Sequence, residues 1–220
     1  AIYFGMENNR TYPFTPEKLD YKLGDLEPFI DAKTMQLHYD RHYTGYINAL
    51  NEVLARYPEL HGFDLKTLLD LSFGEGAADI APDDRVLVSR NAGGVLNHEF
   101  FFKSLRQATG EIIIGRSQAL ANQIARDFGD WENFKAEFAA ALPSVFGSGY
   151  LWLAKDAQNS LHLAATSNQT YLNSPNLTPI FCVDLWEHAY YLKNYNARAD
   201  YLNNLWHVID WHELSERFAK

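Results

Sequence analysis

Two long stretches of helical periodicity occupy the first half of the chain, and together they predict a helical hairpin. The first can be capped by Asp31 and ended by Pro58. Its apolar positions include Leu37, Ile47, Leu50, Val53 and Leu54. The second is expected to start at Asp83 or Asp84 and to run to about Gln107. Two long helices joined by a loop favour an antiparallel pair.

The connection between these helices is predicted to hold a short helix over 65–71 and a loop at Gly74-Glu75-Gly76. A glycine pair, Gly93-Gly94, lies inside the second long helix. Each glycine costs a helix about 1 kcal/mol relative to alanine. The pair therefore indicates that another part of the molecule comes close to the helix at this point.

The second half of the chain changes character after residues 108–115. Helical patterns at 118–128 and 131–142, the latter capped by Asp130, precede two short strands at 150–153 and 161–163 that read as a hairpin. A third strand is expected at 180–185 and a helical tail from about Ala199. The expected fold class is α+β, with an N-terminal α-hairpin domain at 1–108 packed on a C-terminal α/β domain at 109–220 with a small three-stranded antiparallel sheet.

Composition excludes several classes of protein. The 220 residues carry a net charge of -9, so the basic footprint of a nucleic-acid-binding protein is absent. The one cysteine, Cys182, allows neither an intrachain disulfide nor a thiolate cluster for zinc or iron–sulfur. We expect it to be a small buried apolar residue. No apolar run approaches the ~18 residues of a membrane span. Such cysteine usage favours a cytoplasmic protein without excluding an exported one.

Metal-ligand chemistry is concentrated in the segment 184–191, where Asp184 and His188 lie four residues apart among large aromatic residues. Carboxylate and neutral imidazole are good ligands for first-row metals. His38 and His42 share a helix face four residues apart, and His98 lies on the second long helix. An antiparallel hairpin can bring His38 and His98 together, so these residues predict a site that bridges the two halves of the chain.

Each residue also has a plainer explanation. A histidine pair at this spacing is more often unrelated to metal, a single helical histidine such as His98 is more often a hydrogen-bonded residue, and Asp184 could cap the turn after a strand. The aromatic residues around them are by default core packing. The combination, rather than any single residue, is informative.

The combination resembles the iron/manganese superoxide dismutases over nearly the whole chain, from about Tyr12 to Trp211. The matching blocks, in the same order, are Leu37-His38-(x3)-His42-(x3)-Tyr46; Asn91-Ala92-Gly93-Gly94-Val95-Leu96-Asn97-His98; Phe146-Gly147-Ser148-Gly149-Tyr150-Leu151-Trp152-Leu153; Asp184-Leu185-Trp186-Glu187-His188-Ala189-Tyr190-Tyr191; and Asn196-Ala197-Arg198-(x2)-Tyr201. The Asp-x-Trp-Glu-His-x-Tyr motif is the most specific of them.

The resemblance implies a role for each matched residue. His38, His98, Asp184 and His188 would bind one manganese or iron ion, with water or hydroxide as a fifth ligand. His42 would not be a ligand but would meet Tyr191 across a dimer interface, and Glu187 would pair with His188 of the partner subunit and orient it. Tyr46 would lie at the mouth of the substrate channel. The resemblance implies a homodimer, with a tetramer also known in the family.

One glutamine position separates the manganese and iron branches of the family. In the manganese pattern the glutamine follows an asparagine in the C-terminal half, and Asn168-Gln169 matches. In the iron pattern it lies four residues before the second ligand histidine, where this chain has Gly94. The resemblance therefore favours manganese, although some members use either metal. The plainer explanation of Gln169 is a solvated loop residue.

The chain departs from the family in its aromatic residues. Phe102 and Tyr150 stand where tryptophan is usual, while Trp152 and Trp186 keep the pattern. Both changes lie in the aromatic residues and not among the ligands, so we expect them to bear on metal tuning and product inhibition more than on the activity itself. Superoxide is an anion and the chain is acidic, so local positive charge is needed to attract it. Arg41 and Arg198 match basic positions near the family's channel, and the plainer explanation of Arg41 is a solvated surface charge.

The function that these residues imply is disproportionation of superoxide to dioxygen and hydrogen peroxide, with the metal cycling between M(III) and M(II). Zinc has no redox chemistry and cannot do this. The alternative from another class is a metal-binding relative with the same fold and no turnover. A zinc hydrolase would leave Gln169 and the aromatic residues unexplained.

Overall fold

The computed structural model describes residues 10–71, 79–109 and 118–220. The predicted loop at 74–76 and the change of character at 110–115 lie outside these residues. The first long helix is continuous but uneven, because α1 (Ala32–Leu37) and α2 (Thr44–Leu54) are joined by a π-helical segment at His38–Tyr43. Such wider turns occur frequently at functional sites.

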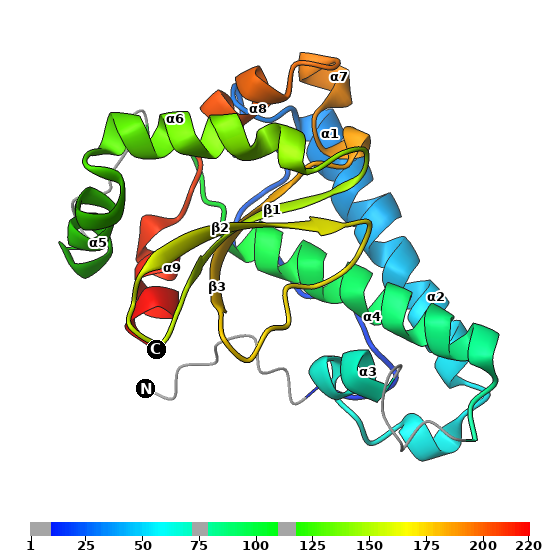
Figure 1. Ribbon diagram of the computed structural model, residues 1–220. Helices are drawn as coiled ribbons and strands as arrows, with labels where there is room; N and C mark the ends of the chain where they lie inside the picture. Colours follow the sequence, from blue (N-terminus) through cyan, green and yellow to red (C-terminus); the bar gives the residue numbers. More distant parts are fainter. Residues whose placement is uncertain (1–9, 72–78, 110–117) are drawn as a thin grey trace.

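The helical hairpin is confirmed. Helix α4 (Pro82–Lys103) packs along α2, and α3 (Leu65–Leu71) packs against the other side of α4 (Figure 1). Pro82 takes the first position of α4, where its missing N–H group costs nothing. The expected end of this helix at Gln107 was wrong. After Lys103 the chain pairs with the segment before helix α9 (Trp211–Ala219): Arg106 N donates to Val208 O at 2.7 Å.

A three-stranded antiparallel sheet forms the centre of the C-terminal half, as predicted. Its order is β2 (Leu161–Ser167), β1 (Gly149–Lys155), β3 (Thr178–Asp184). Helices α5 (Gln118–Phe128) and α6 (Trp131–Ala141) lead into it, and the Asp130 side chain caps α6 by accepting from Asn133 N. Helices α7 (Tyr191–Asn194), α8 (Arg198–Leu205) and α9 (Trp211–Ala219) follow β3.

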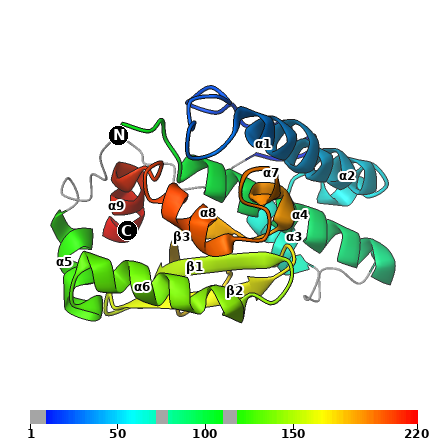
Figure 2. The same cartoon turned by 90° about the horizontal axis from the view of Figure 1, so that it is seen from above.

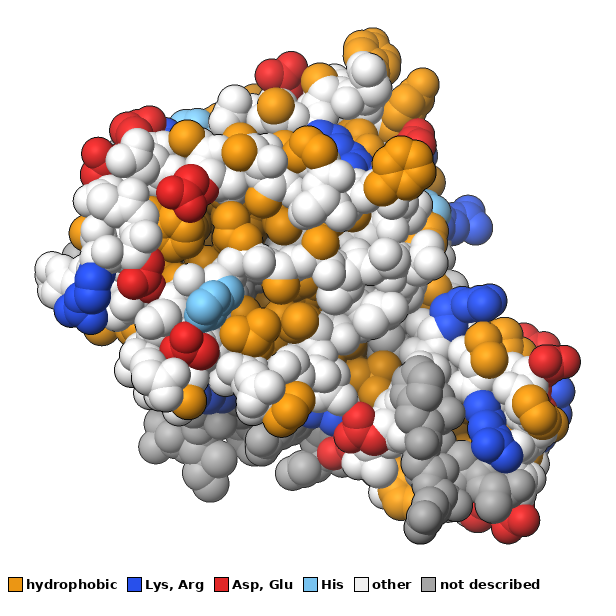
Figure 3. Space-filling view, in the orientation of Figure 1, with side chains coloured by type: hydrophobic (Ala, Val, Ile, Leu, Met, Phe, Trp, Pro, Cys, Tyr) orange, Lys and Arg blue, Asp and Glu red, His pale blue; other side chains and the backbone are white. Residues whose placement is uncertain are grey.

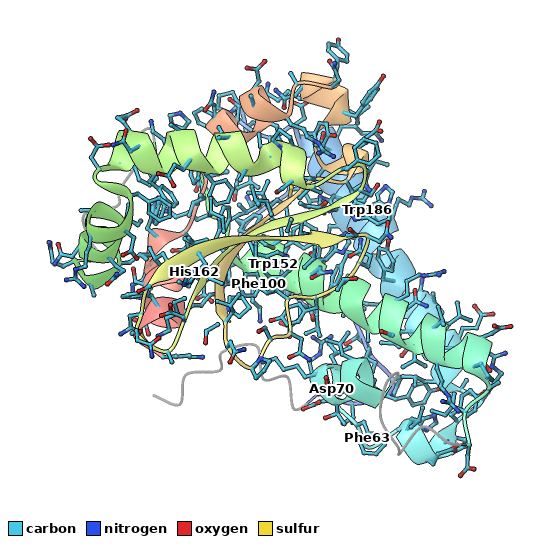
Figure 4. The ribbon with its side chains drawn as sticks, in the orientation of Figure 1. Phe63, Asp70, Phe100, Trp152, His162 and Trp186 are labelled. Atoms are coloured by element: carbon cyan, nitrogen blue, oxygen red, sulfur yellow. The ribbon has the colours of Figure 1, made fainter. Side chains whose placement is uncertain are left out.

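The two halves meet where α4 crosses the sheet (Figures 1 and 2). Phe100 of α4 packs on Trp152 of β1, with ring centroids 5.4 Å apart (Figure 4). Every residue of β1 is buried, so this central strand is covered on both faces. The fold class is therefore as expected. The boundary between residues 108 and 109 stays a prediction. Among the described residues, no helix is long and apolar enough to cross a membrane.

Arg217 fastens the last helix to this junction. Its guanidinium is buried over the ring of Phe100, 3.8 Å from the centroid, and donates to Ser104 Oγ at 2.8 Å and Ile180 O at 2.9 Å. Arg217→Ala should lower the free energy of unfolding of the metal-free protein by about 3 kcal/mol, because buried acceptors lose their donor. Denaturant unfolding followed by tryptophan fluorescence measures it. The control is Arg56→Ala, whose exposed guanidinium pairs with Asp84. Equal losses in the two variants would contradict this account.

Candidate metal centre

Four side chains from three distant segments converge where α4 meets the end of β3. They are His38 from the π-helical segment, His98 from α4, Asp184 from the end of β3 and His188 from the turn after it. One potential ligand atom from each lies within 4.8 Å of the others. His38, His98 and Asp184 are fully buried, and the His188 side chain is 14% exposed.

The end of β3 positions Asp184 through the sheet register and through its own turn. Asp184 pairs with Tyr150 of β1. Its Oδ1 accepts from Trp186 N at 2.9 Å, while its Oδ2 faces the histidines. Asp184 therefore caps the turn with Oδ1 and faces the centre with Oδ2. The Oδ2 atom is 2.9 Å from His38 Nε2, 3.7 Å from His188 Nε2 and 4.0 Å from His98 Nε2.

The histidines are arranged to present nitrogen lone pairs. His98 Nδ1 donates to the Gly94 carbonyl at 2.6 Å, which leaves Nε2 as the acceptor nitrogen. Within the described part of the chain, neither His98 Nε2 nor His188 Nε2 has a hydrogen-bond partner, although both are buried. Buried polar atoms are rarely left unpaired. Three imidazole nitrogens and one carboxylate oxygen, without thiolate, suit manganese or iron, so the residues fit such an ion.

The protonation states suit metal binding. Burial lowers the pKa of His98 to about 3, and burial also lowers the pKa of His38 despite its contact with Asp184. Burial alone would raise the pKa of Asp184, but His188 and His38 outweigh it and the pKa lies below its ordinary value. Neutral imidazole and ionised carboxylate are the ligand forms, and both exist here at neutral pH.

Gln169, on the connection between β2 and β3, is buried beside the centre. Asn97 Nδ2 donates to its backbone carbonyl at 2.9 Å and to its Oε1 at 3.1 Å. The Tyr150 hydroxyl donates to the same Oε1 at 3.0 Å. Burial raises the pKa of Tyr46, and the neighbouring Gln169 amide opposes that rise. Gln169 is thus buried and fixed by hydrogen bonds from Asn97 and Tyr150, and it is not a solvated loop glutamine.

The glycine pair of α4 is explained by two close approaches. A Cβ at Gly93 would lie 2.3 Å from the Gln169 carbonyl oxygen, and one at Gly94 would lie 2.4 Å from Cδ1 of Tyr46. Real Cβ atoms do not come so near. The missing side chains therefore let Gln169 and Tyr46 reach the centre, as the glycine pattern indicated.

The predicted aromatic residues lie at different depths. Phe102 contacts His38 and Tyr46 contacts His98, with ring centroids 4.9 and 5.3 Å apart. Trp186 lies 5.7 Å from His188 and donates from Nε1 to Asn168 O at 2.9 Å. Trp152 is one layer further away, 6.1 Å from Tyr150, and donates to Thr166 Oγ1.

The remaining predicted residues are spread around this centre. His42 stacks on His188 at 3.8 Å, and burial followed by the two neighbouring histidines lowers its pKa to about 4. Glu187, Tyr191 and Arg41 are exposed. Arg198 donates to the carbonyls of Val145, Gly147 and Leu185 and to the Tyr190 hydroxyl. Its guanidinium thus joins the segment before β1 to the segment after β3.

One residue of the site was not singled out from the sequence. Asn97, next to His98, orients Gln169 through the two hydrogen bonds above. Its one signal in the sequence is its place inside a helical pattern directly before a candidate ligand. Its partner lies 72 residues away, and only the fold brings the two together.

Comparisons with known proteins agree along the chain. Residues 13–106 match the family model described as iron/manganese superoxide dismutases, alpha-hairpin domain, and residues 116–217 match the C-terminal domain of the same family. A manganese superoxide dismutase of Thermus thermophilus is 39% identical over 209 residues, covering 95% of this chain and 98% of the relative. One from Leptolyngbya boryana is 38% identical over 211 residues, covering 94% and 82%. One from Yersinia enterocolitica is 37% identical over 209 residues, covering 92% and 96%.

Proposed function

The chain belongs to the iron/manganese superoxide dismutase family, and we propose that its centre works with manganese, assisted by Gln169 and Tyr46. It is an enzyme that disproportionates superoxide to dioxygen and hydrogen peroxide. The observation that carries this function is the convergence of His38, His98, Asp184 and His188 within 4.8 Å. When bound, manganese or iron supplies the one-electron exchange, alternating between M(III) and M(II).

The protein residues supply position, electrostatics and protons. Asp184 brings one negative charge to the ligand set, and burial lowers the pKa of His38 and His98, which favours their neutral form. Gln169 and Tyr46 place an amide and a phenol beside one another at the centre. Each reaction cycle consumes two protons, and these two side chains are polar groups through which protons would reach superoxide at the centre.

The position of the active-site glutamine in the chain favours manganese over iron. Gln169 reaches the centre from the β2–β3 connection. A glutamine at position 94 would have to occupy the space of the Tyr46 ring. Reconstituting metal-free protein with manganese or with iron, and measuring superoxide consumption for each form, tests this preference. We expect the manganese form to be more active; higher activity of the iron form would contradict the proposal.

Gln169→Leu provides a test of the glutamine. Leucine keeps the volume but removes the amide, so kcat should fall about 10-fold to 100-fold while metal content stays near one ion per chain. Stopped-flow superoxide consumption and metal analysis measure the two. Gln158→Leu, at an exposed position of the β1–β2 turn, is the control. An unchanged kcat for Gln169→Leu would remove Gln169 from the proposed mechanism.

Positive charge would draw superoxide to the centre. Arg41 is exposed one residue before His42, and we assign it a steering role. Arg198, whose donors hold the carbonyl groups of Val145 and Leu185, is assigned the same role on the resemblance alone. Steering of this kind weakens with ionic strength.

A homodimer is proposed on the side where His188 approaches the surface. Large exposed apolar side chains gather there: Phe146 (97% exposed), Tyr191 (50%), Leu192 (50%) and Tyr195 (67%). Hydrophobic atoms protrude over α7 in Figure 3. Glu187 is exposed beside His188, where it could pair with His188 of the partner subunit. Sedimentation velocity tests the assembly; a monomer at all concentrations would contradict it.

The non-catalytic alternative is weaker because a passive metal site needs only its ligands. In such a protein there would be no need for a buried Gln169 amide whose oxygen accepts from both Asn97 and Tyr150. Nor would there be a need for the close fit of Tyr46 over Gly94.

A further inference from the structure

A tyrosine hydroxyl connects a metal ligand to the glutamine of the site. Tyr150 lies opposite Asp184 in the sheet and is fully buried. Its hydroxyl is 3.0 Å from Gln169 Oε1 and 3.3 Å from Asp184 Oδ2. An amide oxygen and an ionised carboxylate can only accept, so the hydroxyl is the donor and its one proton is shared between them.

The orientation of the Gln169 amide follows from its donors. The backbone carbonyl of Gln169 can only accept, so the Asn97 atom that contacts it is the amide nitrogen. That nitrogen also donates to Oε1 of Gln169, where Tyr150 provides a second donor. Two donors therefore hold the oxygen, and Nε2 is turned away from them. Within the described residues this buried Nε2 has no hydrogen-bond partner.

We propose that Tyr150 is a positioning residue, whose hydroxyl holds the Gln169 N–H group toward the centre and draws electron density from the Asp184 carboxylate. The inference rests on the proposed function, because it takes Asp184 as a ligand and Gln169 as the residue that serves the bound solvent. A hydrogen bond to a ligating carboxylate weakens it as an electron donor. Loss of the hydroxyl therefore has two effects at once: the Gln169 side chain is held less firmly, and the Asp184 carboxylate becomes a stronger electron donor to the metal.

Tyr150→Phe removes one oxygen atom and keeps the ring. The matched control is Tyr171→Phe, since Tyr171 is also buried and packs on the same Trp152. Each variant is loaded with manganese, and metal content, thermal midpoint, the visible absorption spectrum, kcat and KM are measured. For Tyr150→Phe we expect full metal content, a shifted spectrum and a kcat reduced about tenfold, with KM little changed. Tyr171→Phe should match the wild type.

Tyr150→Trp separates the two contacts, because an indole N–H group is fixed in the ring plane and cannot turn between Gln169 and Asp184 as a hydroxyl hydrogen can. We expect it to recover part of kcat while its spectrum stays different from that of the wild type. If Tyr150→Phe does not fold, this variant carries the comparison. A wild-type spectrum in every Tyr150 variant, or the same changes in Tyr171→Phe, would overturn the inference. If either result is found while the wild-type protein is active, the proposed function still holds and only the role of Tyr150 is rejected. A wild-type protein that is loaded with metal but inactive contradicts the proposed function itself.

Discussion

His188→Ala should abolish stable metal binding and reduce superoxide consumption by about 10³-fold or more. The substitution removes one of three imidazoles and leaves His38, His98 and Asp184. Because the His188 side chain reaches the surface (14% exposed), water can fill the polar space that its removal leaves, and the metal-free protein should unfold only slightly below the wild-type temperature. The proposed contact of His188 with Glu187 of the partner subunit also predicts a weaker dimer.

The control is His162→Ala, which removes a histidine from β2 that pairs with Asp156 at the surface (Figure 4). It should keep full metal content and activity. Metal analysis after dialysis, together with sedimentation velocity, measures both effects. If His188→Ala kept one manganese or iron ion per chain, His188 would not be a ligand.

Gly94→Ala should reduce kcat about 10-fold to 100-fold without removing the metal, because the new Cβ displaces Tyr46 from its place beside His98. The Cβ would lie 2.4 and 2.5 Å from Cδ1 and Cγ of the ring, close to the base of a side chain that cannot swing aside freely. The gain in helix propensity is about 1 kcal/mol. Overpacking costs about 1–3 kcal/mol, so stability should fall slightly.

Gly45→Ala is the matched control, since Gly45 lies in α2 and a Cβ there would meet nothing within 4 Å. It should raise stability by up to about 1 kcal/mol and leave kcat unchanged. The double variant Gly94→Ala, Tyr46→Ala should be more stable than Gly94→Ala plus Tyr46→Ala would predict by addition, because the clash is absent. Wild-type kcat and stability in Gly94→Ala would show that the ring moves at no cost.

Local pattern predicted most of the elements of this fold. The apolar runs of β1 and β2 on either side of a polar turn, the cap at Asp130 and the periodicity of the helical hairpin are properties of short segments. The end of α4 was placed too late because Arg106 pairs with Val208, a tertiary contact that propensity does not contain. The π-helical segment at His38–Tyr43 likewise left no local sign.

The metal ligands could be predicted because their residue types and spacings are distinctive. What surrounds them depends on packing. Spacing alone placed His38 and His42 on one face, yet His38 is buried and His42 is exposed. The hydroxyl of Tyr150 contacts both Gln169 and Asp184. Only the fold shows that a tyrosine at this position touches a ligand.

Elemental analysis and superoxide consumption on one preparation of the protein test the central claim most directly. The claim is that His38, His98, Asp184 and His188 hold one redox-active ion that disproportionates superoxide. We expect about one manganese or iron ion per chain, and activity that rises in proportion to metal content. A protein with a full complement of manganese or iron that did not consume superoxide would contradict the account.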